Sequence, residues 1–462
     1  MYSDRLPPPS MMVSAWDHVL RTALVNLHAF DFGYTVAFTG ATLQSMIDAV
    51  DLCDGADLCA EASFVASAAP LGALLASAGA GRLLDTYGRR PFLIAVSALW
   101  VAGYVIVACA SSLMGFAAGR IIAGAAMGAT SVAVPVYAAE LSPPKLRGSL
   151  GGLFNVLISA GILAVFALGA NGTDDGTWRW MALAAVLPAV FVGVDLHRDW
   201  VPESPRWLAR QGREVEARLA AERLFGRGAE ADEACAVEAP STKRAASQRS
   251  VAVGVGVVGC FGFCGNSCIQ AYMSVVLEGG GLSEASARTG AITYASTQFV
   301  FAVMMALWGV ARFVRRPLLI ASAMGAAASL AAMASFTEAQ DGLASLLSAD
   351  AYIASVTHGV STLSWVYCAE VLPDGERGRG MAYATVLFWG VTFASLQLFN
   401  VAVATLTVAG VLGLFALFSA GGALFCYGFV VETRGAALSD VQRLFADTPA
   451  SPPASEGDAL LA

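Results

Sequence analysis

Long apolar stretches alternate with short polar loops along this chain. Stretches of roughly 20 apolar residues, the length that crosses about 30 Å of hydrocarbon as a helix, recur on both sides of one long polar segment, residues 198–249. The pattern predicts an all-α membrane protein with twelve transmembrane helices in two pseudo-symmetric six-helix bundles. We expect these helices near residues 18–41, 62–82, 92–110, 113–139, 150–170 and 178–196, and then near 250–278, 287–311, 316–336, 344–368, 381–404 and 406–430.

The same pattern divides the chain into two bundles, a linker and two tails. The linker holds the sequence ESPRWLARQGREVEARLAAERLFGRG, in which apolar positions are interspersed with Arg and Glu. This spacing predicts amphipathic helices outside the bilayer rather than a third domain. The expected parts are an N-terminal tail (1–17), a first bundle (18–197), the linker (198–249), a second bundle (250–431) and a C-terminal tail (432–462).

Composition excludes several classes of function. The chain is 57% hydrophobic and 13% charged, whereas soluble domains carry about 25% charged residues. The net charge of -8 is spread over loops and tails, and no basic patch supports nucleic-acid binding. No phosphate loop, metal-ligand cluster or nucleophile triad occurs in the sequence, so neither an enzyme nor a cofactor is expected.

The distribution of Lys and Arg predicts the orientation in the membrane. Basic residues gather in alternate loops, which we therefore expect in the cytosol together with both termini. The loop Asp48–Glu61 is purely acidic and should face outside. Cys53 and Cys59 in that loop could close a small disulfide. Asn171 begins a formal glycosylation sequon on the same side.

Three loop sequences of the first half recur in the second half. Each pair follows equivalent spans, which indicates an internal repeat. The pairs are GRLLDTYGRRP (Gly81–Pro91) with ARFVRRP (Ala311–Pro317), AAELSPPKLRG (Ala138–Gly148) with CAEVLPDGERGRG (Cys368–Gly380), and PESPR (Pro202–Arg206) with VETRG (Val431–Gly435).

With these loops the chain resembles the sugar-porter family of the major facilitator superfamily over about residues 20–445. Two further motifs carry the resemblance, R-x-x-x-G-x-x-x-G in Arg120–Gly128 and P-x-Y-x-x-E-x-S-P-x-x-x-R-G in Pro135–Gly148. The resemblance implies a monomeric carrier of a hexose or related polyol that works by alternating access of the two halves. Its expected partners are that solute and the lipid bilayer. A carrier of a non-sugar organic solute and a non-transporting sugar sensor remain as alternatives, and the short tail disfavours the sensor.

Charged side chains at the cytosolic helix ends predict a latch. Carboxylates near helix N-termini and arginines near helix C-termini complement the helix dipoles. We expect pairs among them to hold the two halves together when the solute site opens outward and to break when it opens inward. The alternative role is to set topology and cap helices. Ala311 stands where the second half should have an acid, so the latch should be asymmetric. The latch residues are Asp85, Arg89, Arg90, Glu140, Arg147, Glu203, Arg206, Glu370, Arg377 and Glu432.

Amide and aromatic side chains inside the spans are the first candidates for a sugar site. Polar side chains there are costly unless satisfied, and amides both donate and accept hydrogen bonds. The resemblance places Asn155 where sugar porters typically have a glutamine. It places Trp365 where their tryptophan lies under the sugar, and Trp389 where another lies near the ring. Phe388 replaces the asparagine that usually precedes this last tryptophan.

The seventh span departs from the family pattern. Its sequence FGFCGNSCIQAYM (Phe261–Met273) lacks the paired glutamines of the family. Ser267 occupies the family's asparagine position, and Gln270 lies one turn beyond it as a substitute. Tyr272 survives from a tyrosine pair and is expected to act in a gate, while Gln298 is the polar candidate of the eighth span. Fewer hydrogen-bonding groups imply a solute smaller or less polar than glucose, or weaker affinity for glucose.

The first span carries the question of energy coupling. Proton-driven sugar porters have F-G-Y-D there, and the aspartate pairs with the arginine of the fourth span. This chain has Thr35 at that position and keeps Arg120, which favours a facilitator. Asp31 lies one helical turn before Thr35 and could pair with Arg120 instead. Proton symport through Asp31 therefore remains the alternative, with His358 as a further candidate for the relay.

The C-terminal tail bears on cellular location. Residues 456–461 read EGDALL, a pattern of the kind that endosomal sorting adaptors bind. We expect the plasma membrane, with an endosomal or vacuolar membrane as the alternative.

Overall fold

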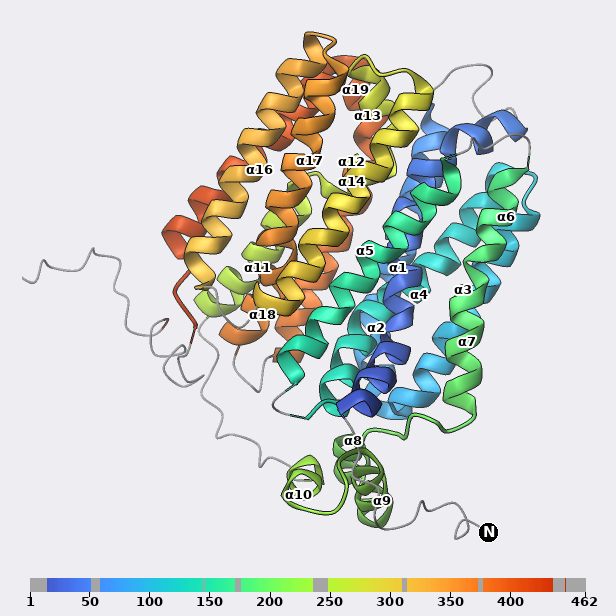
Figure 1. Cartoon of the computed structure of the whole chain (residues 1–462), viewed down its shortest axis with the longest axis vertical. Helices are drawn as coiled ribbons and strands as arrows, with labels where there is room; N and C mark the ends of the chain where they lie inside the picture. Colours follow the sequence, from blue (N-terminus) through green and yellow to red (C-terminus); the bar gives the residue numbers. More distant parts are fainter. Residues whose placement is uncertain are drawn as a thin grey trace, which may run out of the picture.

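The computed structural model describes residues 15–50, 59–143, 146–170, 176–235, 248–309, 314–372, 377–434 and residue 445. The elements of these residues are helices, and they form two bundles that lie side by side (Figure 1). The first bundle consists of α1 (Ala15–Val50), α2 (Ala60–Tyr87), α3 (Arg89–Cys109), α4 (Leu113–Leu141), α5 (Arg147–Gly169), α6 (Thr177–Ala184) and α7 (Val186–His197).

The second bundle follows three short helices, α8 (Pro205–Arg210), α9 (Glu214–Phe225) and α10 (Ala229–Cys235). These three lie beyond one end of the first bundle, the lower end in Figure 1. We call this end of the molecule the motif end and the opposite one the far end. The second bundle consists of α11 (Gln248–Phe263), α12 (Asn266–Ala271), α13 (Met273–Gly279), α14 (Glu284–Met304), the π-helix η1 (Met305–Gly309), α16 (Arg315–Glu338), α17 (Gly342–His358), α18 (Val360–Val371) and α19 (Arg377–Phe429).

Helix length and hydropathy agree with the twelve predicted spans. Within the described residues, nine helical stretches are long and apolar enough to cross a membrane. One of them, Arg379–Phe429, has two legs, because Thr407 interrupts α19 with non-helical dihedral angles (φ 65°, ψ 170°). The remaining two spans are the more polar α1 and the α17–α18 pair. The chain is therefore a multi-pass membrane protein.

Two of the predicted continuous spans are interrupted at residues with non-helical dihedral angles. Residues 250–278 form α11, α12 and α13, and the first break falls at Gly265, whose φ of 83° is left-handed. A Cβ at Gly265 would lie 2.5 Å from the ring of Phe415, so this position requires glycine in two ways. Residues 344–368 break between α17 and α18 at Gly359. Such breaks at membrane depth free backbone groups where a solute passage can use them.

Small residues bring the helices of the first bundle close together. A Cβ at Gly33 of α1 would lie only 1.8 Å from the carbonyl oxygen of Ile158 on α5. Close approach of backbones at small residues is a common way for membrane helices to associate. It fixes α1, which carries several of the candidate site residues, against α5.

Candidate functional site

A small pocket lies between the two bundles. Both bundles contribute to its wall, as an alternating-access site requires. The lining residues are Thr35, Val36, Ala66, Ala69, Pro70, Arg120 and Met127 from the first bundle and Ser267, Ala271, Trp389, Thr392 and Leu396 from the second. The sequence predicted site roles for Ser267 and Trp389 and missed Thr392.

Three buried polar atoms of this lining have no hydrogen-bond partner within the described residues. They are the indole nitrogen Nε1 of Trp389, the hydroxyl Oγ1 of Thr392 and the guanidinium nitrogen Nε of Arg120. Each of these side chains is at most 2% exposed. A buried polar atom without a partner costs about 1–3 kcal/mol, so these atoms are candidates for hydrogen bonds to a bound ligand.

A cluster of amides lies beside the pocket in the second bundle. The Nε2 of Gln270 donates to Oε1 of Gln298 (3.0 Å) and to Oδ1 of Asn266 (3.4 Å). The hydroxyl of Tyr294 also donates to Oδ1 of Asn266 (3.4 Å). The structure therefore brings together Gln270 and Gln298, two of the predicted residues, and adds Asn266 as their shared partner. Only its place next to the Gly265 break could have marked Asn266 in the sequence.

Aromatic rings connect the remaining candidates across the two bundles. The ring of Trp389 lies 4.9 Å from that of Phe388 and 5.7 Å from that of Phe32 on α1. Trp365 packs on Phe388 from α18, with ring centroids 5.6 Å apart. Phe388 also stacks on Phe261 at 5.1 Å. These contacts make this wall aromatic and apolar.

Asn155 and Tyr272 lie at two different edges of this site. Asn155 is half-buried on α5, beside Phe154, whose ring is 6.2 Å from Phe32. No hydrogen bond within the described residues engages the Asn155 amide group. Tyr272 is buried, stacks on Phe399 with centroids 4.2 Å apart and donates to the carbonyl oxygen of Leu396 (3.3 Å).

Hydrogen bonds between the two bundles close the far end. The Oγ of Ser67 donates to Oε1 of Gln397 (2.7 Å), and Nδ2 of Asn400 donates to the carbonyl oxygen of Cys59 (2.8 Å). Ser274 donates to the carbonyl oxygen of Gly40 (3.0 Å). Cys59 is disulfide-bonded, whereas Cys53 lies outside the described residues. The pocket is thus covered on the far side in this conformation.

Arg120 does not form an ion pair with Asp31 in the described structure. Its Nη1 donates to the carbonyl oxygen of Thr35 (3.0 Å), and its guanidinium group lies 5.9 Å from the ring of Phe38. Asp31 instead contacts His28, with 3.5 Å between Nδ1 and Oδ2. The sequence allowed an Asp31–Arg120 pair because Asp31 lies one helical turn before Thr35, but Arg120 binds the Thr35 carbonyl group and Asp31 contacts His28. His358, at the end of α17, packs edge-on against Phe301.

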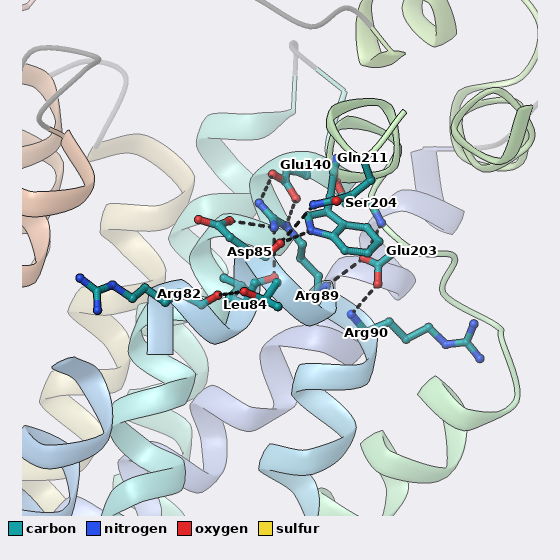
Figure 2. A network of polar contacts seen from close by, with 11 residues as sticks. Arg82, Leu84, Asp85, Arg89, Arg90, Glu140, Glu203, Ser204 and Gln211 are labelled. Carbon is teal, nitrogen blue, oxygen red and sulfur yellow. Dashed lines mark hydrogen bonds and ion pairs between the residues drawn. The ribbon is translucent and has the colours of Figure 1, made fainter. Parts of the chain in front are cut away.

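A network of charged residues lies at the motif end of the first bundle (Figure 2). Arg89 donates from Nε and Nη2 to both carboxylate oxygens of Glu140 (2.8 and 2.9 Å) and from Nη1 to Asp85 (3.1 Å). The carboxylate of Glu203 accepts the backbone N–H groups of Arg89 and Arg90 (3.0 and 3.1 Å). Glu203 therefore caps the N-terminus of α3.

The second bundle repeats this arrangement in reduced form. Glu432 accepts the backbone N–H groups of Arg315 and Arg316 (3.0 Å each) and so caps α16. Arg315 donates to Glu370 from Nη2 at 3.2 Å, the counterpart of Arg89 and Glu140. The position equivalent to Asp85 is Ala311, which lies outside the described residues.

The pKa values of the two capping carboxylates, Glu203 and Glu432, shift in opposite directions. Burial raises the pKa of Glu203 above its ordinary value, although N–H bonds from Ser204, Arg90 and Arg89 oppose the change. Burial acts in the same direction on Glu432, but the N–H bonds it accepts outweigh burial and lower its pKa. The two caps therefore hold their protons with different strength.

The ion pairs of the predicted latch lie within each bundle in this conformation. Arg89 pairs with Asp85 and Glu140 of the first bundle, and Arg315 pairs with Glu370 of the second. A latch between the halves remains a prediction for the state that opens outward. Arg206 is half-buried on α8. The side chains of Arg147 and Arg377, the sequon at Asn171 and the tail pattern 456–461 lie outside the described residues.

Comparison with known proteins agrees with this architecture. The family model described as "Sugar (and other) transporter" matches residues 22–445. The sugar transporter ERD6-like 7 of Arabidopsis thaliana is 28% identical and covers 93% of this chain and 94% of its own length. The glucose transporter GlcP of Staphylococcus epidermidis is 30% identical and covers 82% of this chain and 87% of its own length.

Solved structures with the same fold include the xylose transporter XylE from E. coli. Its partially occluded inward-open conformation aligns with a TM-score of 0.78 at 23% identity and covers 91% of this chain and 99% of that one. The proton:xylose symporter XylE bound to 6-bromo-6-deoxy-D-glucose aligns with a TM-score of 0.77 at 23% identity and covers 94% of this chain and 100% of that one. These alignments show that the chain has the major facilitator fold.

Proposed function

The chain belongs to the sugar transporter family, and on that premise we propose that it carries a hexose or related polyol by alternating access of its two bundles. One observation supports this proposal above the others. Three buried donors without a partner among the described residues, on Trp389, Thr392 and Arg120, belong to side chains that line a pocket to which both bundles contribute. Hydroxyl-rich solutes offer acceptors to such donors and an apolar ring face to the neighbouring aromatic side chains.

The apolar wall points to a solute with fewer polar groups than glucose. Phe261 and Phe388 stack on each other where the family has amides, which leaves Gln270, Gln298 and Asn266 as the amide cluster. We therefore propose that deoxyhexoses, pentoses or small polyols are carried better than glucose. A non-sugar organic solute is the competing outcome.

We further propose that the motif end faces the cytosol and that the protein acts as a monomer at the plasma membrane. The arginines of α3 and α16 gather at that end, as expected for cytosolic loops. The sequence favours passive transport because Thr35 replaces an acid, and proton symport through Asp31 is the alternative. Both stay predictions.

Uptake of a labelled panel of hexoses, deoxyhexoses, pentoses and polyols into transporter-null cells tests the proposal. We expect saturable uptake of at least one of them, with deoxyhexose, pentose or polyol preferred over glucose. Thr392→Val keeps the shape of the side chain and removes one donor, so KM should rise about 5- to 10-fold. Thr385→Val is the matched control, because the Thr385 hydroxyl already donates to the carbonyl oxygen of Met381 on the same helix.

The outcomes separate the alternatives. Uptake of none of these compounds by protein that reaches the membrane would eliminate a sugar or polyol carrier. Equal KM values for Thr392→Val and Thr385→Val would show that the pocket described here is not the binding site.

A further inference from the structure

One face of α1 carries a row of polar side chains that the solute pocket does not account for. His28, Asp31, Thr35, Thr39 and Thr42 are spaced three or four residues apart, so they share a face of the helix. All five are at most 1% exposed. Only Thr35 lines the pocket between the bundles. The row therefore lies inside the first bundle, where polar groups are expensive unless they have a function.

His28 and Asp31 form a pair within this row. Their side chains are both 0% exposed, and Nδ1 of His28 lies 3.5 Å from Oδ2 of Asp31. The other ring nitrogen of His28, Nε2, lies 3.1 Å from Oγ of Ser97 on α3. Ser97 donates onward to the carbonyl oxygen of Leu93 (3.0 Å). The imidazole ring is thus held between a carboxylate and a hydroxyl.

The carboxylate of Asp31 is otherwise without polar contacts. Neither of its oxygens has a hydrogen-bond partner within the described residues, and the same is true of Nδ1 of His28. A carboxyl group with only a structural role would be expected to accept hydrogen bonds. A negative charge there without a cation would cost several kcal/mol. One proton held between the two groups removes that cost.

The titratable groups of neighbouring helices do not provide that cation. Tyr104 of α3 interacts electrostatically with both Asp31 and Arg120, and its hydroxyl lies 2.6 Å from Oγ1 of Thr35. Arg120 of α4 binds the Thr35 carbonyl group. Tyr34 of α1 donates to the carbonyl oxygen of Met181. The remaining titratable residues of α5 and α7, which also pack on α1, lie at helix ends: Arg147 begins α5, and Asp195 and His197 are in the last turn of α7.

We propose that His28 and Asp31 form a proton-binding site inside the first bundle and that one proton taken up there accompanies each solute molecule. This inference rests on the proposed sugar transport and deepens it. The proton forms a new N–H or O–H bond at Nδ1 of His28 or Oδ2 of Asp31, which changes the pair from a net charge of −1 to 0. The same bond breaks when the proton leaves to the other side of the membrane.

The position of the pair on α1 connects it to the solute pocket. Phe32, next to Asp31, contacts Trp389 of the second bundle. Thr35, one turn on, donates to the carbonyl oxygen of Asp31 (2.8 Å) and lines the pocket. A small rotation or shift of α1 on protonation would therefore move pocket residues directly.

Purified full-length protein in liposomes tests this proposal with two transport readouts. Equilibrium counterflow of the sugar that the panel identifies reports solute binding and exchange without a driving force. Accumulation under an inward acid gradient reports proton coupling. For one proton per sugar, a gradient of one pH unit sustains up to about tenfold accumulation, and a protonophore should abolish it.

Single variants distinguish the role of the His28–Asp31 pair from that of the solute pocket. Asp31→Asn and His28→Gln should lose accumulation and keep counterflow, which also shows that they fold. His18→Gln is the matched control, because His18 is a second buried histidine of α1 that stacks on Phe225, away from the pair. It should accumulate sugar as the unchanged protein does. Ser97→Ala should shift the pH midpoint of accumulation, because it removes the hydroxyl group on Nε2.

The possible failures are distinguishable. Counterflow without accumulation in the unchanged protein would overturn the proton site and leave the sugar carrier intact, as would accumulation that survives both pair variants. If no sugar shows counterflow, the proposed function fails, and infrared difference spectra between acid and neutral pH still test the site. A protonated-carboxyl band that disappears in Asp31→Asn supports it, and the absence of such a band overturns it.

Discussion

Removal of Arg89 should destabilise the protein more than removal of its counterpart Arg315. The Arg89 side chain is 3% exposed and binds both oxygens of Glu140, whose side chain is 11% exposed. Breaking a buried ion pair by removing one partner costs about 3–5 kcal/mol, because the other charge is left buried. Arg89→Ala should therefore lower the free energy of unfolding by about this amount.

The second bundle provides the internal comparison. Arg315 reaches Glu370 through Nη2 at 3.2 Å, and these side chains are 12% and 31% exposed. Loss of a hydrogen bond to a charged group costs about 1.5–3 kcal/mol, so Arg315→Ala should cost less than Arg89→Ala. Asp85 is 71% exposed, and its replacement by Asn should cost at most about 1 kcal/mol.

Unfolding of the purified protein in detergent, followed by tryptophan fluorescence, provides the measurement. A double-mutant cycle with Arg89→Ala and Glu140→Ala should give a coupling energy that accounts for most of the Arg89 effect. Equal losses for Arg89→Ala and Arg315→Ala, or a loss for Asp85→Asn as large as that for Arg89→Ala, would refute the reasoning from burial.

Three further predictions concern single residues. Trp365→Ala should abolish uptake while the protein still reaches the membrane, because its ring supports the aromatic wall through Phe388; unchanged uptake would exclude Trp365 from the site. Gln298→Ala should raise KM more than Gln298→Glu does, because only the alanine leaves Nε2 of Gln270 without its acceptor at 3.0 Å. Uptake kinetics over a concentration series decide this. The raised pKa of Glu203 means that the folded protein binds this proton more tightly than the unfolded chain. The contribution of Glu203 to stability is therefore complete below the ordinary carboxyl pKa of about 4.3 and is lost as pH rises through the raised pKa. The melting temperature of unchanged protein should therefore fall more steeply with rising pH in this range than that of Glu203→Gln.

Hydrophobic pattern predicted most of the fold because membrane spans are long and must satisfy their own backbone. It did not predict the breaks at Gly265 and Gly359, since a glycine within an apolar stretch has the same hydropathy whether the helix continues or stops. It also separated 381–404 from 406–430 at residue 405, and the structure interrupts α19 two residues later, at Thr407.

The sequence named several candidate residues that the structure places at the pocket or in contact with each other. Trp389 and Ser267 do line the pocket, and Gln270 and Gln298 do meet. Thr392 and Asn266 were missed, because threonine and asparagine are common in spans and only the fold brings these two to the site. His28 lies three residues before Asp31, a spacing that places both on one helix face, yet only the structure shows that Asp31 contacts His28 rather than Arg120.

For Glu203 and Glu432, the sequence could not identify the groups that their carboxylates bind. Both were identified as acids near arginines, which predicted side-chain ion pairs. In the structure each accepts backbone N–H groups at the start of a helix more than 110 residues away in sequence. Helix capping was the alternative role predicted for these acids, but a backbone donor has no sequence signature, so the sequence could not identify which helix each acid caps.

Locking the far end tests the central claim, alternating access through the pocket, most directly. The side chains of Ser67 and Gln397 meet across the two bundles at 2.7 Å, so in the double variant Ser67→Cys, Gln397→Cys a short bifunctional methanethiosulfonate reagent should bridge the two thiols. We predict that uptake of the identified sugar stops on cross-linking and returns on mild reduction, while the Ser67→Cys single variant is unaffected. Undiminished uptake by fully cross-linked protein would contradict the account.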